Sequence, residues 1–208
     1  MESSVFYQFN AKAYDVLDKT YFRKAASSPR NAVTSLLGNE PLNILDMCTG
    51  TGSNAIAIAR TKGNASVTGI DLSQAMLLIA TDKLEKEGLS NVSFVQMDAA
   101  KLQFGNEEFD VVLISLVLHE ISQELAGQLL SEAKRVLKSN GKLIVLEWEE
   151  PVRRLKKIAF YLIKKTEPKG FEEFLKYDMH HYFALSGFII NQIVHCDYSK
   201  VMIMGKET

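Results

Sequence analysis

Hydrophobic and polar positions alternate along this chain in a way that indicates strands followed by helices. Short apolar runs typical of buried strands lie at residues 42–47, 66–71, 92–96, 110–115 and 142–147. Segments with helical periodicity lie between them, at residues 53–62, 73–87 and 122–137. Ser73 and Ser122 stand where N-caps are expected, and Gly88 follows a helix as a C-terminal stop. Strand and helix in repeated alternation predict a parallel sheet with right-handed crossovers.

The last part of the chain follows a different pattern. Two strand candidates, residues 188–195 and 200–204, are separated by only four residues. So short a link fits an antiparallel hairpin and not a crossover. Further helical segments are expected at residues 5–21, 29–37, 155–165 and 171–186. The pattern as a whole predicts about seven strands, mostly parallel, in a three-layer α/β domain.

The chain is expected to form one domain, because its 208 residues fit a single unit. Within that domain we expect N-terminal helices at residues 1–40 and a ligand-binding core at 41–150. A helical insertion on the substrate side should follow at 151–187, and the hairpin should end the chain at 188–208.

Composition places the protein among ordinary globular proteins, with 47% hydrophobic and 24% charged residues. Two cysteines, Cys48 and Cys196, cannot form a disulfide framework, and the N-terminal sequence lacks the layout of a secretion signal. The longest apolar run, residues 111–118, is far shorter than a membrane span. We therefore expect a soluble, cytoplasmic protein, and the sequence leaves its oligomeric state open.

Charge is distributed unevenly. The net charge of −1 argues against a general nucleic-acid binder. Residues 153–169 contain seven Lys or Arg residues against Glu167 alone, a local charge of +6, so the rest of the chain carries −7. This basic window has two interpretations. It contacts a membrane surface or an anionic substrate, or it is a solvated helix face with apolar residues packed beneath it.

A glycine-containing loop follows the first predicted strand, where open parallel sheets bind ligands. Gly50 and Gly52 let the backbone approach a ligand closely, and the next helix offers free N–H groups at its start. Residues 50–55 also match the dinucleotide pattern G-x-G-x-x-G/A, and Asp71 follows about 20 residues later. An NAD(P)-dependent oxidoreductase is therefore an alternative interpretation.

Acidic residues at three successive strand ends favour another ligand. Asp46 precedes the loop and would repel a pyrophosphate, whereas it suits a cationic group. Asp71 can bind ribose hydroxyls, and Asp98 can accept a hydrogen bond from an exocyclic amine. Together they predict a pocket for a positively charged, nucleoside-like molecule.

Three segments resemble the motifs of class I S-adenosylmethionine-dependent methyltransferases, and most closely those of the quinone-biosynthesis and small-molecule group. They are residues 45–52, 69–76 and 109–112, and the resemblance extends over residues 11–205. It implies a Rossmann-like sandwich with an N-terminal helical appendage and strand order 3-2-1-4-5-7-6, with strand 7 antiparallel. It also implies S-adenosylmethionine as cofactor and methyl transfer to a small molecule.

The resemblance further implies roles for individual residues. Asp46 and the glycine loop would lie along the methionine portion of the cofactor, Asp71 on the ribose, and Asp98 with Ala99 at the adenine. Met76 would line the adenine pocket or fill the core, and Tyr14 would close over the cofactor or pack its own helix. The cofactor-binding residues expected are Tyr14, Asp46, Cys48, Thr49, Gly50, Gly52, Asp71, Leu72, Met76, Asp98, Ala99 and Ser115.

The chain departs from the family pattern in two places. Cys48 stands where the family often has glycine. His119-Glu120 stands where quinone-type members usually carry Arg-Asn, which argues against a quinone substrate. The Asn/Asp-Pro-Pro-Tyr signature of DNA amine methylation is absent from residues 115–118, so DNA is not an expected partner.

His119 is the candidate catalytic residue, because it follows an apolar strand on the expected substrate side. An imidazole there could take a proton from the acceptor, or it could be a hydrogen-bonded histidine that starts a loop. No metal site is expected, because His180 and His181 have no suitable ligands near them in the sequence. A non-catalytic binding protein that docks through its basic window is the remaining alternative.

Overall fold

The computed structural model describes residues 28–168 and 170–207. Seven strands form one sheet in the order β3-β2-β1-β4-β5-β7-β6. Only β7 runs antiparallel to its neighbours β5 and β6, and the other pairs are parallel. The strands are β1 (Asn43–Met47), β2 (Ser66–Asp71), β3 (Val92–Gln96), β4 (Phe109–Ser115), β5 (Leu137–Trp148), β6 (Phe188–His195) and β7 (Ser199–Lys206). The expected Rossmann-like fold, strand order and C-terminal hairpin are confirmed.

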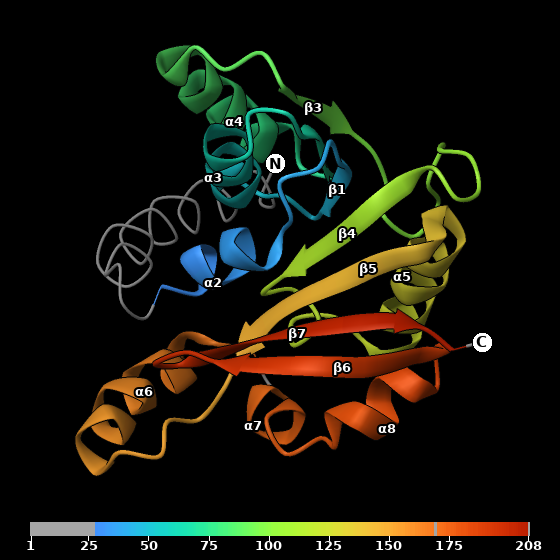
Figure 1. Ribbon diagram of the computed structural model, residues 1–208. Coiled ribbons are helices and arrows are strands. Elements are labelled where there is room, and N and C mark those ends of the chain that lie inside the picture. The colour runs from blue at the N-terminus through green and yellow to red at the C-terminus, as the bar shows by residue number, and fades with distance from the viewer. Residues whose placement is uncertain (1–27, 169, 208) are drawn as a thin grey trace.

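Helices cover both faces of the sheet, which makes three layers (Figure 1). One face carries α2 (Pro29–Leu36), α3 (Ser53–Thr61) and α4 (Gln74–Glu87). The other carries α5 (Gln123–Val136), α7 (Phe171–Phe174) and α8 (Met179–Ala184). The remaining described helix, α6 (Arg154–Thr166), projects beyond the end of β5. None of the helices in the described ranges is long and apolar enough to span a bilayer.

Alternation along β1 shows how the core is divided. Ile44 packs in the cluster on the α2 and α3 side, whereas Leu45 and Met47 pack in the cluster with α5. Because side chains alternate along a strand, Asp46 points to the same side as Ile44, toward α3. The sheet is therefore buried on both faces, and a carboxylate is placed inside one of the two cores.

The expected helix ends agree with the structure. Ser73 and Ser122 are the N-caps of α4 and α5, where their side chains accept hydrogen bonds from the backbone N–H groups of Met76 and Leu125. Gly88 ends α4 in the left-handed conformation. Short polar side chains and a glycine were sufficient to predict these boundaries because capping is a local interaction.

Two segments differ from the expectation. The fifth strand is expected at residues 142–147, but β5 already begins at Leu137 and includes residues 139–141, opposite a register irregularity between Phe109 and Val111 of β4. A Cβ atom at Gly141 would meet the backbone oxygen of Asp110 at 3.0 Å, which explains the glycine. Residues 171–186 were read as a single helix, but Asp178 caps a second one and divides the segment into α7 and α8.

Candidate active site

The candidate site lies along the carboxyl ends of the parallel strands. The glycine loop follows β1, Asp71 ends β2, Asp98 follows β3, and His119 follows β4. Because these strands are parallel neighbours, their carboxyl ends share one edge of the sheet. The structure therefore brings together side chains that are more than 70 residues apart in sequence. Tyr14, also expected at the site, lies outside the described residues.

Asp46 is a buried carboxylate with one oxygen that has no hydrogen-bond partner among the described residues. Its side chain is only 1% exposed, and Oδ2 accepts a hydrogen bond of 2.6 Å from the Thr49 hydroxyl. Oδ1 has no hydrogen-bond partner within the described residues. Burial raises the pKa of Asp46 to about 7, although the Thr49 hydroxyl partly opposes this shift. A cationic ligand beside Oδ1 would favour the ionised form.

Asp71 holds the glycine loop in place. Its Oδ2 accepts a 2.8 Å hydrogen bond from the Gly50 backbone N–H, and its Oδ1 accepts one of equal length from Ser73 N–H. Burial raises the pKa of Asp71, and the hydrogen bonds from the backbone of Ser73 and Gly50 oppose the shift. One carboxylate thus fixes the loop after β1 to the start of α4.

Cys48 has a left-handed backbone conformation, which glycine adopts most readily. Its φ is 58°, in the left-handed region that side chains disfavour. Burial is the main reason that the pKa of its thiol rises to about 12, and nearby negative charges raise it further. Those charges belong to Asp71, Asp46, Asp98 and Glu120. The thiol is therefore protonated at neutral pH, and several carboxylates lie around the loop.

The two loop glycines have different surroundings. Gly52, with φ at 72°, packs so closely that a Cβ atom would lie 2.5 Å from the Phe94 ring and 2.8 Å from Ala80. Gly50 also has a positive φ of 56°, but no atom lies within 4 Å of its Cβ position. Gly52 therefore serves the packing of the loop on α4 and β3, whereas Gly50 borders open space at the candidate site.

The residues expected at the adenine side surround the end of β3 and the start of α4. Asp98 is exposed, and its Oδ1 accepts a 2.9 Å hydrogen bond from Ala100 N–H. Ala99 and Met76 are buried, whereas Leu72 is 70% exposed. Leu72 is exposed between two half-buried residues, Asp71 and Ser73, so it presents an apolar surface beside Asp71.

A polar chain that the sequence did not reveal leads from β4 to α2. The Ser115 hydroxyl accepts a 3.0 Å hydrogen bond from Asn54 Nδ2, and Asn54 Oδ1 accepts one of 3.2 Å from Arg30 Nε. Ser115 was expected at the site, but Asn54 and Arg30 were not. No local pattern connects these residues, because they come from three separate elements.

His119 lies between two carboxylates. Its Nδ1 is 2.7 Å from Glu147 Oε2, and its Nε2 is 3.2 Å from Glu167 Oε2. Burial alone would lower the pKa of His119, but the charge of Glu147 and its hydrogen bond, followed by Glu167, raise it to about 10. The imidazole is therefore protonated at neutral pH. Its ring also packs edge-on against Phe171, with centroids 5.3 Å apart.

Glu147 is the partner that sequence analysis overlooked. It is fully buried, and its Oε1 accepts hydrogen bonds from the backbone N–H groups of Val117 and Leu118. An acidic residue at the end of the apolar strand β5 was an available signal. Glu167 gave no such signal, because it is 48 residues from His119 and lies between α6 and α7.

A metal could be considered at this cluster. Within the described part of the chain, His119, Glu120 and Glu167 each offer a ligand atom, and these atoms lie within 4.8 Å of one another. In the structure His119 Nε2 pairs with Glu167 Oε2 at 3.2 Å, and this ion pair by itself brings the two side chains together.

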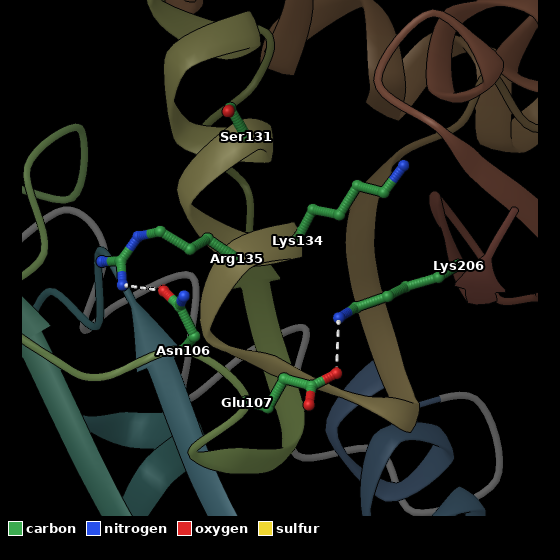
Figure 2. Close-up of a pocket in the computed structure, with 6 residues that line it drawn as sticks. All are labelled: Asn106, Glu107, Ser131, Lys134, Arg135 and Lys206. Atoms are coloured by element: carbon green, nitrogen blue, oxygen red, sulfur yellow. Dashed lines mark hydrogen bonds and ion pairs between the residues drawn. The ribbon is translucent and has the colours of Figure 1, made fainter. Parts of the chain in front are cut away.

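An open pocket of about 520 Å³ lies at the other end of the sheet, beside the amino ends of β4 and β5 (Figure 2). Its residues are Asn106, Glu107, Ser131, Lys134, Arg135 and Lys206. Arg135 Nη1 donates to Asn106 Oδ1 at 3.0 Å, and Lys206 is 3.8 Å from Glu107. These groups connect α5 to neighbouring loops and are not part of the candidate site.

Comparison with known proteins agrees with this geometry. Residues 44–141 match the methyltransferase domain family. A ubiquinone/menaquinone biosynthesis C-methyltransferase from Shewanella pealeana is 31% identical over 173 residues, which cover 81% of this chain and 68% of that protein. The chain belongs to the class I S-adenosylmethionine-dependent methyltransferases. Membership in this family implies S-adenosylmethionine as the cofactor.

Two further matches support the same family. A demethylmenaquinone methyltransferase from Bacteroides fragilis is 34% identical over 157 residues, 74% of this chain. The chain covers only 63% of that relative's length. Among solved structures, an S-adenosylmethionine-dependent methyltransferase from Aquifex aeolicus has a TM-score of 0.72 at 21% identity, covering 93% of this chain and 97% of its own. That likeness supports the fold.

Proposed function

We propose that this chain transfers a methyl group from S-adenosylmethionine to a small organic acceptor. The observation that carries the proposal is the group of carboxylates around the glycine loop: buried Asp46, whose Oδ1 has no partner among the described residues, and Asp71, which binds the Gly50 N–H. A sulfonium and an α-amino group suit these carboxylates, whereas a diphosphate would be repelled.

We assign the cofactor-binding residues from the family resemblance together with the carboxylates around the loop. Asp46, Cys48, Thr49, Gly50 and Gly52 would border the methionine portion. Asp71 and exposed Leu72 would face the ribose, and Met76, Asp98 and Ala99 the adenine. Ser115 and Tyr14 complete the proposed set.

The bound cofactor supplies an activated methyl group on a sulfonium, so the residues need little acid or base chemistry. The protein contributes most by holding the acceptor in line with the methyl carbon and by excluding water. The backbone of Gly50, fixed by Asp71, gives the ligand close access to the loop. The carboxylates around the loop favour a cation there over a neutral ligand.

We propose that His119 holds the segments on the substrate side of the site in place. It can act as a base only after these segments rearrange. A general base must be neutral before it accepts a proton, and Glu147 and Glu167 hold His119 in its protonated form. In this arrangement the imidazolium connects the end of β4 to β5 and to the segment after α6. Proton abstraction by His119 would require Glu167 to move away.

Two observations on the class of the methyl acceptor point in opposite directions. The printed names of the relatives concern demethylmenaquinone and the biosynthesis of ubiquinone and menaquinone, which favours a quinol ring. His119-Glu120 replaces the Arg-Asn pair of typical quinone enzymes, which favours a different acceptor. A quinol is therefore the first compound to assay, beside smaller phenols.

Titration calorimetry tests the proposal directly. S-adenosylmethionine and S-adenosylhomocysteine should both bind in the micromolar range, a typical scale for such sites, and NADH should not bind. Mass spectrometry with a quinol and a phenol should then reveal a product that is heavier by one methylene. Binding of NADH without binding of either adenosyl compound would overturn the proposal.

A further inference from the structure

Helix α6 presents an apolar stripe to solvent. Leu155, Ile158 and Leu162 are 83%, 69% and 67% exposed, and their i, i+3, i+7 spacing places them on one side of the helix. Val152, just before the helix, is 92% exposed. The sequence left open whether these residues pack beneath a solvated face, and in the structure they do not.

The opposite side of α6 attaches the helix to the rest of the molecule. Phe160 is fully buried, and it packs in a small cluster with Trp148 of β5 and Phe171 of α7. Lys156 forms an ion pair with Asp197, which lies between β6 and β7. The helix therefore has a packed inner face and an apolar outer face, and the outer stripe is not part of the core.

Basic residues lie next to the apolar stripe. On a helical projection at 100° per residue, Arg154 and Lys165 fall beside Ile158, whereas Lys157 lies toward Phe160 and pairs with Glu150. Arg153 and Arg154 stand at the start of the helix, and its first turn contains no acidic residue. The helix dipole disfavours cations at that end, so local helix stability does not explain these arginines.

We propose that α6 docks on the surface of an anionic lipid bilayer. The 13 residues of α6 extend about 20 Å, which suits a helix lying in the membrane plane and is too short to cross a bilayer. The apolar stripe would enter the boundary between headgroups and acyl chains, while the basic side chains reach the lipid phosphates. Arg154 and Lys165, beside the stripe, supply the attraction, whereas Lys156, Lys157 and Lys164 form ion pairs with Asp197 and Glu150.

Charge complementarity favours lipid over other occupants of the stripe. A second copy of this chain would bring Arg154 and Lys165 of one stripe against the same residues of the other, and these like charges repel each other. Residues 1–27 carry four basic and three acidic side chains, so they offer no acidic complement to the helix. An anionic bilayer provides both a negative surface and an apolar layer.

Docking would orient the candidate site. Helix α6 begins six residues after β5, whose carboxyl end lies at the same edge as the glycine loop and His119. In Figure 1 the helix projects past that end of the sheet. A protein resting on α6 would therefore hold the substrate side of the site near the lipid surface.

Vesicle co-sedimentation tests the proposal on the whole chain without cofactor, so its outcome is independent of the methyltransferase proposal. Vesicles containing phosphatidylglycerol should sediment the protein, and pure phosphatidylcholine vesicles should sediment at least about tenfold less. Added salt should weaken the binding, because exposed charges are screened.

Two variants test the two halves of the surface. The double substitution Ile158→Ser with Leu162→Ser should lower the vesicle partition coefficient by about tenfold or more, because it removes two inserting side chains. Arg154→Gln with Lys165→Gln should lower binding to anionic vesicles only. Leu185→Ser, at a site 76% exposed beyond α8, is the matched control and should bind as the wild type does.

Three results would overturn the proposal. The first is no sedimentation with anionic vesicles, and the second is equal binding by the serine double variant and the wild type. The third is a dimer in solution that the serine double variant abolishes, since this would assign the stripe to a second copy. Melting curves identify variants that are unfolded, and the glutamine pair then remains as the folded test.

Discussion

At the scale of the residue, Cys48 carries backbone strain in the middle of the candidate site. Its φ of 58° is unfavourable for any residue with a Cβ atom, by about 1 kcal/mol or more. Asp71 fixes the next turn of the loop through Gly50 and so helps to hold this conformation. The strain is compatible with the fold because the surrounding hydrogen bonds determine the loop's path.

Replacing Cys48 should expose the size of this strain. Cys48→Gly is expected to be more stable than Cys48→Ala by about 1 kcal/mol, because both remove the sulfur and only alanine keeps the Cβ. Urea unfolding of the two variants measures the difference. Equal stabilities would mean that the loop relaxes around residue 48.

Asp46 should make cofactor binding depend on pH. Its pKa of about 7 means that the carboxylate fraction grows as pH rises from 6 to 8, and the affinity for a cationic ligand should grow with it. Asp46→Asn should bind S-adenosylmethionine at least about tenfold more weakly and with little pH dependence. Calorimetry at pH 6 and pH 8 checks both, and a strong pH dependence in the variant would assign the effect to another group.

The raised pKa of Asp46 affects stability in the opposite direction: affinity for a cation rises with pH, whereas the stability of the ligand-free protein falls. A folded-state pKa above the unfolded value means that the folded protein holds the Asp46 proton more tightly. The contribution of Asp46 to stability therefore declines as pH rises from about 4 to about 7. Asp46→Asn should remove this decline from the stability profile of the ligand-free protein.

At the scale of the element, His119 joins three separate segments. It follows β4, pairs with Glu147 of β5, and pairs with Glu167 between α6 and α7. Removing one partner of a buried ion pair leaves the other charges uncompensated, at a cost of roughly 3–5 kcal/mol. The cluster thus contributes to the attachment of the segment that carries α6.

His119→Gln is expected to lose most stability near neutral pH. A pKa raised to about 10 means that the histidine's contribution is complete below about pH 6.5 and disappears as pH rises through 10. The difference between wild type and variant should therefore shrink between pH 7 and pH 10 in thermal melts.

His195→Gln is the control for this experiment. His195 also pairs with a glutamate, Glu149, at 2.7 Å, but 67% of its side chain is exposed. An exposed pair contributes little, so this variant should follow the wild type at every pH. Equal effects of the two substitutions would contradict a special role for the buried cluster.

At the scale of the whole molecule, the candidate site lies along one edge of the sheet, where the parallel strands end. Residues from β1, β2, β3 and β4 contribute to it, so ligand binding should stabilise the fold as a unit. A ligand that binds only the folded state at 100 times its Kd adds about 2.7 kcal/mol. For a chain of this size each 1 kcal/mol raises Tm by roughly 2–4 °C.

S-adenosylhomocysteine at 100 times its Kd should therefore raise Tm by roughly 5–10 °C. NADH at the same concentration should leave Tm unchanged, which also controls for nonspecific effects of nucleotides. Differential scanning fluorimetry is sufficient for the comparison. A shift with NADH alone would favour the dinucleotide interpretation.

The sequence by itself determined the strands, the hairpin and the acids at the ends of the strands, because periodicity, caps and motif residues are local signals. Ser73, Gly88 and Asp71 illustrate this, since each acts within a few residues of its own position or at a strand end. The order of the strands in the sheet came from the resemblance of three motifs to a known family. Tertiary structure alone decided the surroundings of His119 and the exposure of α6. Glu147 and Glu167 reach His119 from distant segments, and a helical pattern does not show which of two apolar faces is covered.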